Sequence, residues 1–273
     1  MMQQAVAAAD NAVVVRDLGF SYGDLEIFRK LSLDIPRGKV VAILGGSGAG
    51  KSTLLKLIGG QLVPSSGGVF VEGREVHKLG ADELYQLRLG MGMMLQSSGL
   101  FSDVSVYENI AFPIRENFDL DEAVVRRMVL MKLNAVGLRG ARDMMPGDLS
   151  GGMARRVALA RAIATDPKLL IYDEPFAGLD PISLKQIGEL IRTLNDALGL
   201  TSIVVTYDVH EALKVADYAY VIADGSVLGK GTPKQIESSA DPYLKQFVNA
   251  LPDGPVRFHF PAAPIAEDLN LSE

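Results

Sequence analysis

The sequence contains no cysteine, which excludes disulfide bonds, thiolate metal sites and a cysteine nucleophile. It also has no run of about 18 apolar residues, so we expect no segment that crosses a bilayer unaided. Basic residues number 27 and acidic residues 33, which gives a formal net charge of −6. Without a surplus of positive charge, the chain is not expected to bind nucleic acid by neutralising phosphates. These absences indicate a soluble protein of a reducing compartment.

The composition is otherwise that of a folded protein. The 273 residues allow one large domain or two small ones, and their 48% hydrophobic and 22% charged residues exclude wholesale disorder. Residues 1–12 lack a basic segment before their alanines, so we expect a flexible leader and not a signal peptide. Residues 251–273 are rich in proline, which predicts an extended tail without helix.

Apolar strands alternate with helical stretches in the rest of the chain, which predicts an α/β fold. The continuous apolar runs 40–44, 169–172 and 203–205 predict strands that are buried on both faces of a parallel sheet. Asp224-Gly225 lies between two β-rich segments and predicts a hairpin. The stretch from about 97 to 165 has helical periodicity and no strong strand, so we interpret it as a helical insertion.

A glycine-rich motif, GGSGAGKS, follows the apolar run 40–44 and precedes a predicted helix. It fits G-x-x-x-x-G-K-[ST], in which backbone N–H groups and the helix N-terminus surround a phosphate. Lys51 can reach the β- and γ-phosphates, and the Ser52 hydroxyl can ligate Mg²⁺. The alternative, a glycine-rich turn with a chance lysine, is disfavoured by the strand and helix on either side. The predicted ATP-binding residues are Gly45, Gly46, Ser47, Gly48, Ala49, Gly50, Lys51, Ser52 and Thr53.

Two further motifs suit the same chemistry. Asp173, at the end of an apolar strand, can anchor Mg²⁺, and Glu174 beside it can act as the general base for an attacking water. The alternative for this pair is a solvated turn. The segment Leu149-Ser150-Gly151-Gly152 predicts a second phosphate-binding helix start, with Ser150 as N-cap and uncovered N–H groups at Gly151 and Gly152. Taken alone, this segment could also be an ordinary Ser-Gly helix start.

Together, these three motifs resemble the nucleotide-binding domain of ABC transporters. The resemblance covers roughly residues 13–240, and it implies a domain over 13–250. The implied fold is a P-loop NTPase (RecA-like) core with an antiparallel β subdomain and an inserted α-helical subdomain over about 97–165. In that family, the LSGG signature of one subunit closes on the ATP held by the P-loop of another. The resemblance therefore implies ATP and Mg²⁺ as ligands, ATP hydrolysis, and a second copy of the chain as partner.

Three more residues match the family by position, and a fourth departs from it. Tyr22 resembles the aromatic residue that stacks on adenine, and Gln96 the Q-loop residue that senses Mg²⁺ and the permease. Asp180 resembles the D-loop aspartate that crosses the dimer interface. Each could also have a purely structural role, with Tyr22 as a core aromatic, Gln96 as a helix cap and Asp180 as a turn residue. Tyr207 departs from the family, which usually has a histidine there that contacts the γ-phosphate. A phenol can donate a hydrogen bond but carries no positive charge, so we expect slower hydrolysis or steric replacement of the histidine by Tyr207. We do not expect nearby His210 to compensate.

Four segments, 97–101, 105–110, 146–156 and 253–258, are similar to ATPases of MCE-protein lipid transporters of the Mla type. That resemblance implies an ATPase pair on the cytoplasmic face of the inner membrane, which drives phospholipid transport between inner and outer membranes. The implied partners are an MlaE-type permease, an MlaB-type STAS protein and, through the permease, an MlaD-type MCE protein. The alternative within transporters is the ATPase of a small-solute, amino-acid-type importer. A small-molecule kinase, a two-cassette ribosomal protein and a regulatory ATP-binding module fit the motifs less well.

The proline-rich tail suggests a role of its own. Residues 251–273 include Phe258 and Phe260, two residues apart, and are ill suited to fold alone. We expect this tail to dock on the neighbouring ATPase or on an accessory subunit, the alternative being a disordered terminus.

Overall fold

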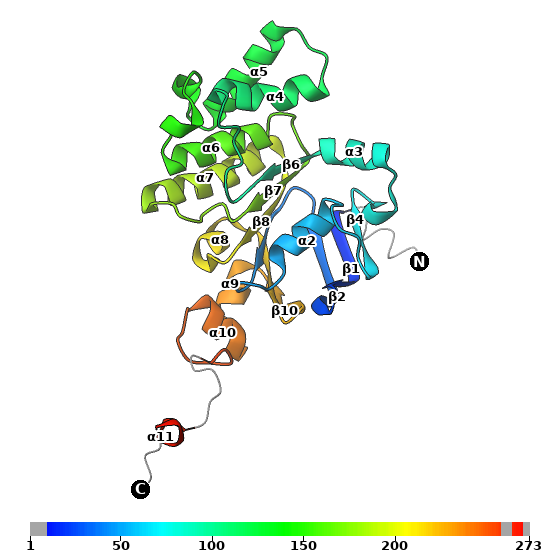
Figure 1. The fold of residues 1–273 in the computed structure, drawn as a ribbon, viewed down its shortest axis with the longest axis vertical. Coiled ribbons are helices and arrows are strands. Elements are labelled where there is room, and N and C mark those ends of the chain that lie inside the picture. Colours follow the sequence, from blue (N-terminus) through cyan, green and yellow to red (C-terminus); the bar gives the residue numbers. More distant parts are fainter. Residues whose placement is uncertain (1–9, 258–263, 270–273) are drawn as a thin grey trace.

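Two β-sheets and their surrounding helices make up residues 10–257 and 264–269, the part of the chain that the computed structural model describes (Figure 1). The larger sheet consists of β3 (Val40–Leu44), β6 (Met91–Met94), β7 (Leu169–Asp173), β8 (Thr201–Thr206), β9 (Tyr218–Ala223) and β10 (Ser226–Gly231). The smaller sheet consists of β1 (Asn11–Tyr22), β2 (Leu25–Pro36), β4 (Ser66–Val71) and β5 (Arg74–Glu75). Their strand orders are β10-β9-β3-β8-β7-β6 and β2-β1-β4-β5.

Strand β3 lies in the middle of the larger sheet and is buried throughout. It pairs in parallel with β8 and β9, and β8, β7 and β6 continue the parallel arrangement. Its side chains alternate between two apolar cores, as expected of a strand covered on both faces. Val41 and Ile43 face the core shared with the smaller sheet, and Val40, Ala42 and Leu44 face the core under the other helices. The structure confirms the predicted buried strand.

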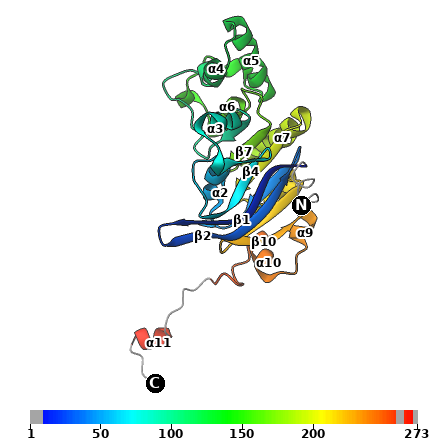
Figure 2. The same ribbon diagram turned by 90° about the vertical axis from the view of Figure 1, so that its right-hand side faces the viewer.

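The smaller, antiparallel sheet packs on the larger one through an apolar core that includes α2 (Lys51–Ile58). Strands β1 and β2 form a long hairpin that extends beyond the rest of this sheet (Figure 2). The hydroxyl of Tyr220 accepts a hydrogen bond of 3.1 Å from the N–H of Asp34 and donates one of 2.9 Å to its carbonyl. Strand β1 begins at Asn11, which pairs with Pro36. The sheet therefore includes the last residues of the expected leader, whose residues 1–9 lie outside the described part.

Helices occupy the segment where a helical insertion is expected. Helices α4 (Val106–Asn117) and α5 (Glu122–Ala135) lie at one end of the molecule, and α6 (Gly151–Ala162) lies between them and the larger sheet (Figure 2). The Ser105 hydroxyl accepts a hydrogen bond from the Glu108 N–H and caps α4. Buried residues of all three helices continue the core on this side of the larger sheet. The predicted helical subdomain is therefore packed on the α/β core and does not stand apart.

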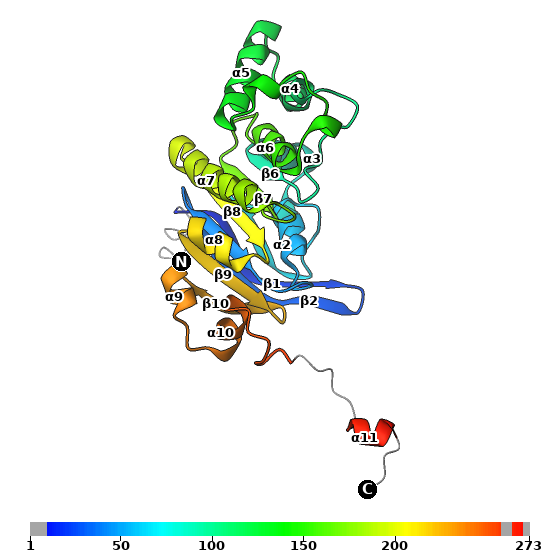
Figure 3. The same ribbon diagram turned by 90° about the vertical axis from the view of Figure 1, so that its left-hand side faces the viewer.

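The remaining helices cover the larger sheet or follow it. Helices α7 (Pro181–Leu198) and α8 (Val209–Val215) lie side by side on the face of the sheet opposite β1 and β2 (Figure 3). Asp224 and Gly225 both have positive φ angles, 48° and 72°, and form the predicted two-residue hairpin turn. In the described residues, no helix has the length and apolar character that a membrane span requires. The other helices between residues 76 and 248 are α3 (Ala81–Leu89), α9 (Pro233–Glu237), α10 (Pro242–Val248) and the 3₁₀ helices η1 (Val76–Lys78), η2 (Arg139–Ala141) and η3 (Pro146–Asp148).

The tail contains a short helix, α11 (Ile265–Asp268), so the prediction of a tail without helix is wrong at this point. The prediction rested on the prolines, but the last of them, Pro264, immediately precedes the helix, where a proline is tolerated. Before the helix, the Gln246 side chain holds the backbone N–H and carbonyl of Val256 at 2.9 and 2.8 Å. Phe258 and Phe260 lie outside the described residues.

Candidate functional site

The predicted phosphate-binding loop connects the end of β3 to the start of α2. Gly50 has a positive φ of 87°, and a Cβ there would lie 2.7 Å from Ile27 and 2.8 Å from the ring of Phe28. A Cβ at Gly45 would lie 2.5 Å from the carbonyl oxygen of Ile222. Only glycine satisfies both the backbone angle and the close approach at Gly50. The fold therefore requires glycine at both ends of the loop.

Lys51 is the first residue of α2, and its side chain is only 8% exposed. Its Nζ donates hydrogen bonds to the carbonyls of Gly45, at 2.7 Å, and Gly46, at 3.1 Å. Burial lowers the pKa of this ammonium, and the carboxylates of Glu174 and Asp173 oppose that effect. The side chain thus folds back over the loop and brings a positive charge to its mouth, where an anion can be bound.

Glu174 follows β7 directly and leaves the strand with a positive φ of 49°. Its Oε2 accepts hydrogen bonds from the Thr206 hydroxyl, at 2.8 Å, and from the Tyr207 N–H, at 3.2 Å, and its Oε1 lies 3.8 Å from Nζ of Lys51. Burial raises the pKa of Glu174 above its usual value, while the two hydrogen bonds and Lys51 lower it. A buried carboxylate with a raised pKa, held in one orientation, is suited to accept a proton.

Asp173 is the last residue of β7, and its Oδ1 is buried without a hydrogen-bond partner among the described residues. Burial raises the pKa of this carboxyl, against the influence of Lys51 and Lys56. A buried carboxylate oxygen without a partner is costly unless a cation or a donor reaches it. The residue is therefore suited to ligate a metal ion.

The metal that this site suits is Mg²⁺. Within residues 10–257 and 264–269, no three or more His, Cys, Asp or Glu side chains gather as a metal cluster would require. The predicted ligands, a hydroxyl at Ser52, an amide at Gln96 and one carboxylate at Asp173, form a sparse oxygen set. Mg²⁺ is commonly bound in this way, with one or two carboxylates and the remaining positions filled by phosphate oxygens and water.

The predicted residues meet around an open cavity of about 720 Å³. Leu25 and Ile27 of β2 also line it, and no sequence motif predicts either of them as a site residue. Tyr207 is 54% exposed, and together with Gln96 it also lines a neighbouring cavity with Asp173. The predicted residues around the first cavity are Ser47, Gly48, Ala49, Gly50, Lys51, Ser52, Thr53, Gln96, Glu174 and Tyr207.

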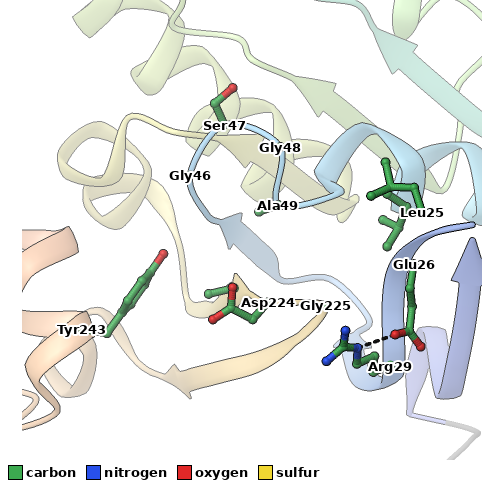
Figure 4. Close-up of a pocket in the computed structure, with 12 residues that line it drawn as sticks. Leu25, Glu26, Arg29, Gly46, Ser47, Gly48, Ala49, Asp224, Gly225 and Tyr243 are labelled. Carbon is green, nitrogen blue, oxygen red and sulfur yellow. Dashed lines mark hydrogen bonds and ion pairs between the residues drawn. The ribbon is translucent and has the colours of Figure 1, made fainter. Parts of the chain in front are cut away.

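A third cavity also borders the phosphate-binding loop (Figure 4). Tyr243 and Arg29 face each other across it, with Asp224 between them, and Arg29 forms an ion pair with Glu26. Because Arg29 is already paired and Asp224 adds a negative charge, this cavity attracts a polyphosphate less than the cavity that contains Lys51.

The signature segment and the predicted D-loop residue lie close to each other but line none of these three cavities. Ser150 caps α6 by accepting a hydrogen bond from the Met153 N–H. A Cβ at Gly152 would lie 2.4 Å from the Ser183 hydroxyl oxygen, and that hydroxyl donates to Asp180, the N-cap of α7. This bond lowers the pKa of the Asp180 carboxyl. Ser150 and Asp180 are both exposed and therefore accessible to another chain.

Tyr22 ends β1 and is 44% exposed. Its ring packs edge to face on Phe20, with ring centroids 4.9 Å apart. Tyr22 does not line the cavity of the phosphate-binding loop, but Leu25, which follows the turn of the same hairpin, does. The structure thus brings the loop, Gln96 and Glu174 together around one cavity, which Tyr22, Ser150–Gly152 and Asp180 do not line.

Comparison with known proteins agrees with these features. Residues 28–177 match the ABC transporter family. The chain is 53% identical to the intermembrane phospholipid transport system ATP-binding protein MlaF of Haemophilus influenzae, with 95% of this chain and 98% of the relative covered. It is 46% identical to the protein of the same name in Escherichia coli K12, with 98% of each covered.

Solved structures support the same assignment. The chain resembles cbiO1 of Clostridium perfringens, part of the ABC transporter complex cbiONQ, with a TM-score of 0.79 and 34% identity over 84% of this chain and 92% of the other. It also resembles the ATP-binding cassette MJ0796, solved as a dimer with ADP and Pi, with a TM-score of 0.74 and 29% identity over 81% and 98%. The predicted fold class is confirmed, and the chain belongs to the ABC transporter family as an ATP-binding subunit.

Proposed function

We propose that this chain is the ATP-hydrolysing subunit of an ABC transporter complex that drives phospholipid transport between the inner and outer membranes. The observation that carries this proposal is the identity of 53% and 46%, over nearly the whole chain, to two intermembrane phospholipid transport ATP-binding proteins. The arrangement of Lys51 and Glu174, 3.8 Å apart at one cavity, supports hydrolysis as the activity. A small-solute importer, the alternative from the sequence, is not favoured by these relatives.

The triphosphate binds in the cavity lined by the phosphate-binding loop. Backbone N–H groups of the loop and the N-terminus of α2 donate to the phosphate oxygens, and Lys51 adds a charge at the β- and γ-phosphates. Ser52, Gln96 and Asp173 would hold Mg²⁺, and the bound ion would neutralise charge on the phosphates. The unpartnered Oδ1 of Asp173 is the observation that supports this ligand set.

Glu174 acts as the general base that orients water and accepts its proton. The Thr206 hydroxyl and the Tyr207 N–H fix one carboxylate oxygen, so the other remains available on the side of Lys51. Tyr207 takes the place that a histidine usually has, and its exposed phenol supplies a hydrogen bond without a positive charge. We expect hydrolysis to be slower for this reason. A Tyr207→His variant with an unchanged ATPase rate in the assembled complex would show that this position does not limit turnover.

Two copies of the chain share each nucleotide. Ser150 and Gly151 are exposed at the capped start of α6, with Gly152 buried behind them, and none of the three lines the cavities at the phosphate-binding loop or around Asp173 of its own chain. A segment that completes another copy's site would be placed in this way. Asp180 lies beside this helix start through Ser183 and contacts the other copy, while Tyr22 stacks on the adenine. The relative solved as an ADP-bound dimer agrees with such an arrangement.

The complex includes a membrane permease of the MlaE type, through which the chain is held at the cytoplasmic face of the inner membrane. Gln96 passes nucleotide-driven closure to the permease, an MlaB-type STAS protein attaches to the ATPase, and an MlaD-type MCE protein attaches to the permease. Residues 251–273 dock on the neighbouring ATPase or on the accessory subunit. Deleting them should weaken the complex in size-exclusion chromatography, and an unchanged complex would refute this role.

The Glu174→Gln variant tests the catalytic assignment. Without a base, it should bind ATP but not hydrolyse it, and it should accumulate as an ATP-bound dimer by size-exclusion chromatography with light scattering. Rapid turnover in this variant would show that the base is misassigned. For the transport assignment, the complex is purified from membranes. An MCE protein and bound phospholipid in it would support lipid transport, and a solute-type permease would overturn that assignment.

A further inference from the structure

Helix α6 carries two arginines that hold the segment around Gln96. Arg155 donates a hydrogen bond of 3.1 Å to the carbonyl of Leu95, immediately before Gln96. Six residues later on the same helix, Arg161 donates to the carbonyls of Gly99, at 2.7 Å, and Ser98, at 3.2 Å. Gln96 therefore lies between two points that are fixed to the same helix, and that helix begins with the signature segment.

Arg155 also reaches the segment between Glu174 and Asp180. Its second terminal nitrogen donates a hydrogen bond of 3.2 Å to the carbonyl of Ala177. The N–H of Ala177 in turn donates to the carbonyl of Glu174, at 3.3 Å. A single guanidinium thus joins three segments, which carry the Q-loop glutamine, the general base with the D-loop aspartate, and the signature.

The chemistry of this link is specific to arginine. Arg155 is only 9% exposed, and within the described residues it takes part in no ion pair. Its hydrogen bonds go to the neutral carbonyls of Leu95 and Ala177. A planar guanidinium presents several N–H groups in fixed directions, whereas a lysine ammonium is a point charge on a flexible stem. Arg155 also lines the cavity that contains Gln96, Asp173 and Tyr207, so its position matters where nucleotide and metal are expected.

We propose that Arg155 is a positioning residue that fixes the Gln96 segment and the Glu174–Asp180 segment to the signature helix, so that nucleotide binding reorients all three together. This inference rests on the proposed ATPase function. Arg155 does not line the cavity that contains the phosphate-binding loop, so its loss should impair hydrolysis and dimer closure more than the binding of ATP to that loop.

The test compares Arg155→Met and Arg155→Lys with Arg127→Met, a control at an exposed position of the helical region, all in the full chain. Hydrogen exchange without nucleotide should be faster in Arg155→Met at residues 95–98 and also at 177–180, and unchanged in the control. With Mg-ATP, kcat should fall at least tenfold while KM changes by less than threefold. The dimer that Glu174→Gln forms with ATP should be reduced when Arg155→Met is added. Arg155→Lys, which can reach one carbonyl at a time, should be intermediate.

Several outcomes would overturn the inference. Wild-type exchange in both segments would show that Arg155 does not fix them, and a tenfold rise in KM with unchanged kcat would make it an ATP-binding residue. If Arg155→Met does not fold, the Lys variant decides, because wild-type exchange and wild-type kcat in it would contradict the link. A failure of the proposed ATPase function would look different, because the wild-type chain itself would not hydrolyse ATP. The hydrogen-exchange experiment needs no nucleotide, so it would still show whether Arg155 holds the two segments.

Discussion

Thr206 donates a hydrogen bond of 2.8 Å from its hydroxyl to Oε2 of Glu174, and both side chains are buried. Thr206 ends β8, and Glu174 directly follows β7, the parallel neighbour of β8, so the two meet at the same edge of the sheet. A hydrogen bond to a carboxylate favours its ionised form. The bond therefore opposes the burial that raises the pKa of Glu174. It keeps the carboxylate ionised, and so able to accept a proton, down to a lower pH.

The Thr206→Val variant should shift the pH dependence of ATP hydrolysis. Valine has a similar shape but donates no hydrogen bond, so the pKa of Glu174 should rise further. Because the base works only when ionised, the acid limb of kcat/KM should move to higher pH, and the rate at high pH should change less than the rate at low pH. The measurement is kcat/KM from pH 5 to 9 with excess Mg²⁺. An acid limb at the wild-type position would show that Glu174 does not govern it.

The Gly50→Ala variant should lose both stability and ATP binding. Its Cβ would meet Ile27 and Phe28 at a positive φ, and the free energy of unfolding should fall by about 1–3 kcal/mol. The distorted loop should weaken ATP binding at least tenfold. Gly46→Ala is the matched control for stability, because no atom lies within 4 Å of its Cβ position. Thermal unfolding measures the stability of both variants, and ATP titration measures binding. An equal loss of stability in the two variants would contradict the steric argument.

The Asp173→Asn variant should separate metal binding from stability. The folded chain raises the pKa of this carboxyl, so the ionised form costs folding free energy above that pKa. Asparagine removes the cost, and the nucleotide-free variant should be more stable than wild type near pH 8, with a difference that vanishes as the pH falls below the usual value of 3.8. The Mg²⁺ concentration for half-maximal hydrolysis should rise more than tenfold. An unchanged Mg²⁺ requirement would remove Asp173 from the ligand set.

The Tyr220→Phe variant should weaken the attachment of the smaller sheet. It loses the two hydrogen bonds to the backbone of Asp34, so the free energy of unfolding should fall by about 1–2 kcal/mol. Tyr218→Phe, in the same strand and in ring contact with Tyr220, is the control and should change it by less than about 0.5 kcal/mol. Denaturant unfolding measures both. Equal losses in the two variants would mean that the hydrogen bonds do not hold the sheets together.

Local patterns predicted most elements of the fold. The apolar run 40–44, the hairpin at Asp224-Gly225 and the helical insertion are confirmed, because a strand buried on both faces, a two-residue turn and a helix each impose a period or a residue type on nearby positions. The tail is the exception. Proline content described its first part, but it said nothing about the four residues after Pro264, which form α11.

The sequence by itself determined the family and the order of the motifs, since glycines that admit the required backbone angles and a lysine at the helix start must be neighbours in the chain. Only the tertiary structure decided which distant groups meet. Thr206 reaches Glu174 across 32 residues, and Arg155 joins Leu95 to Ala177 across 60 and 22 residues. Such contacts depend on strand order and on how α6 packs against the sheet, and no short-range pattern encodes either of these.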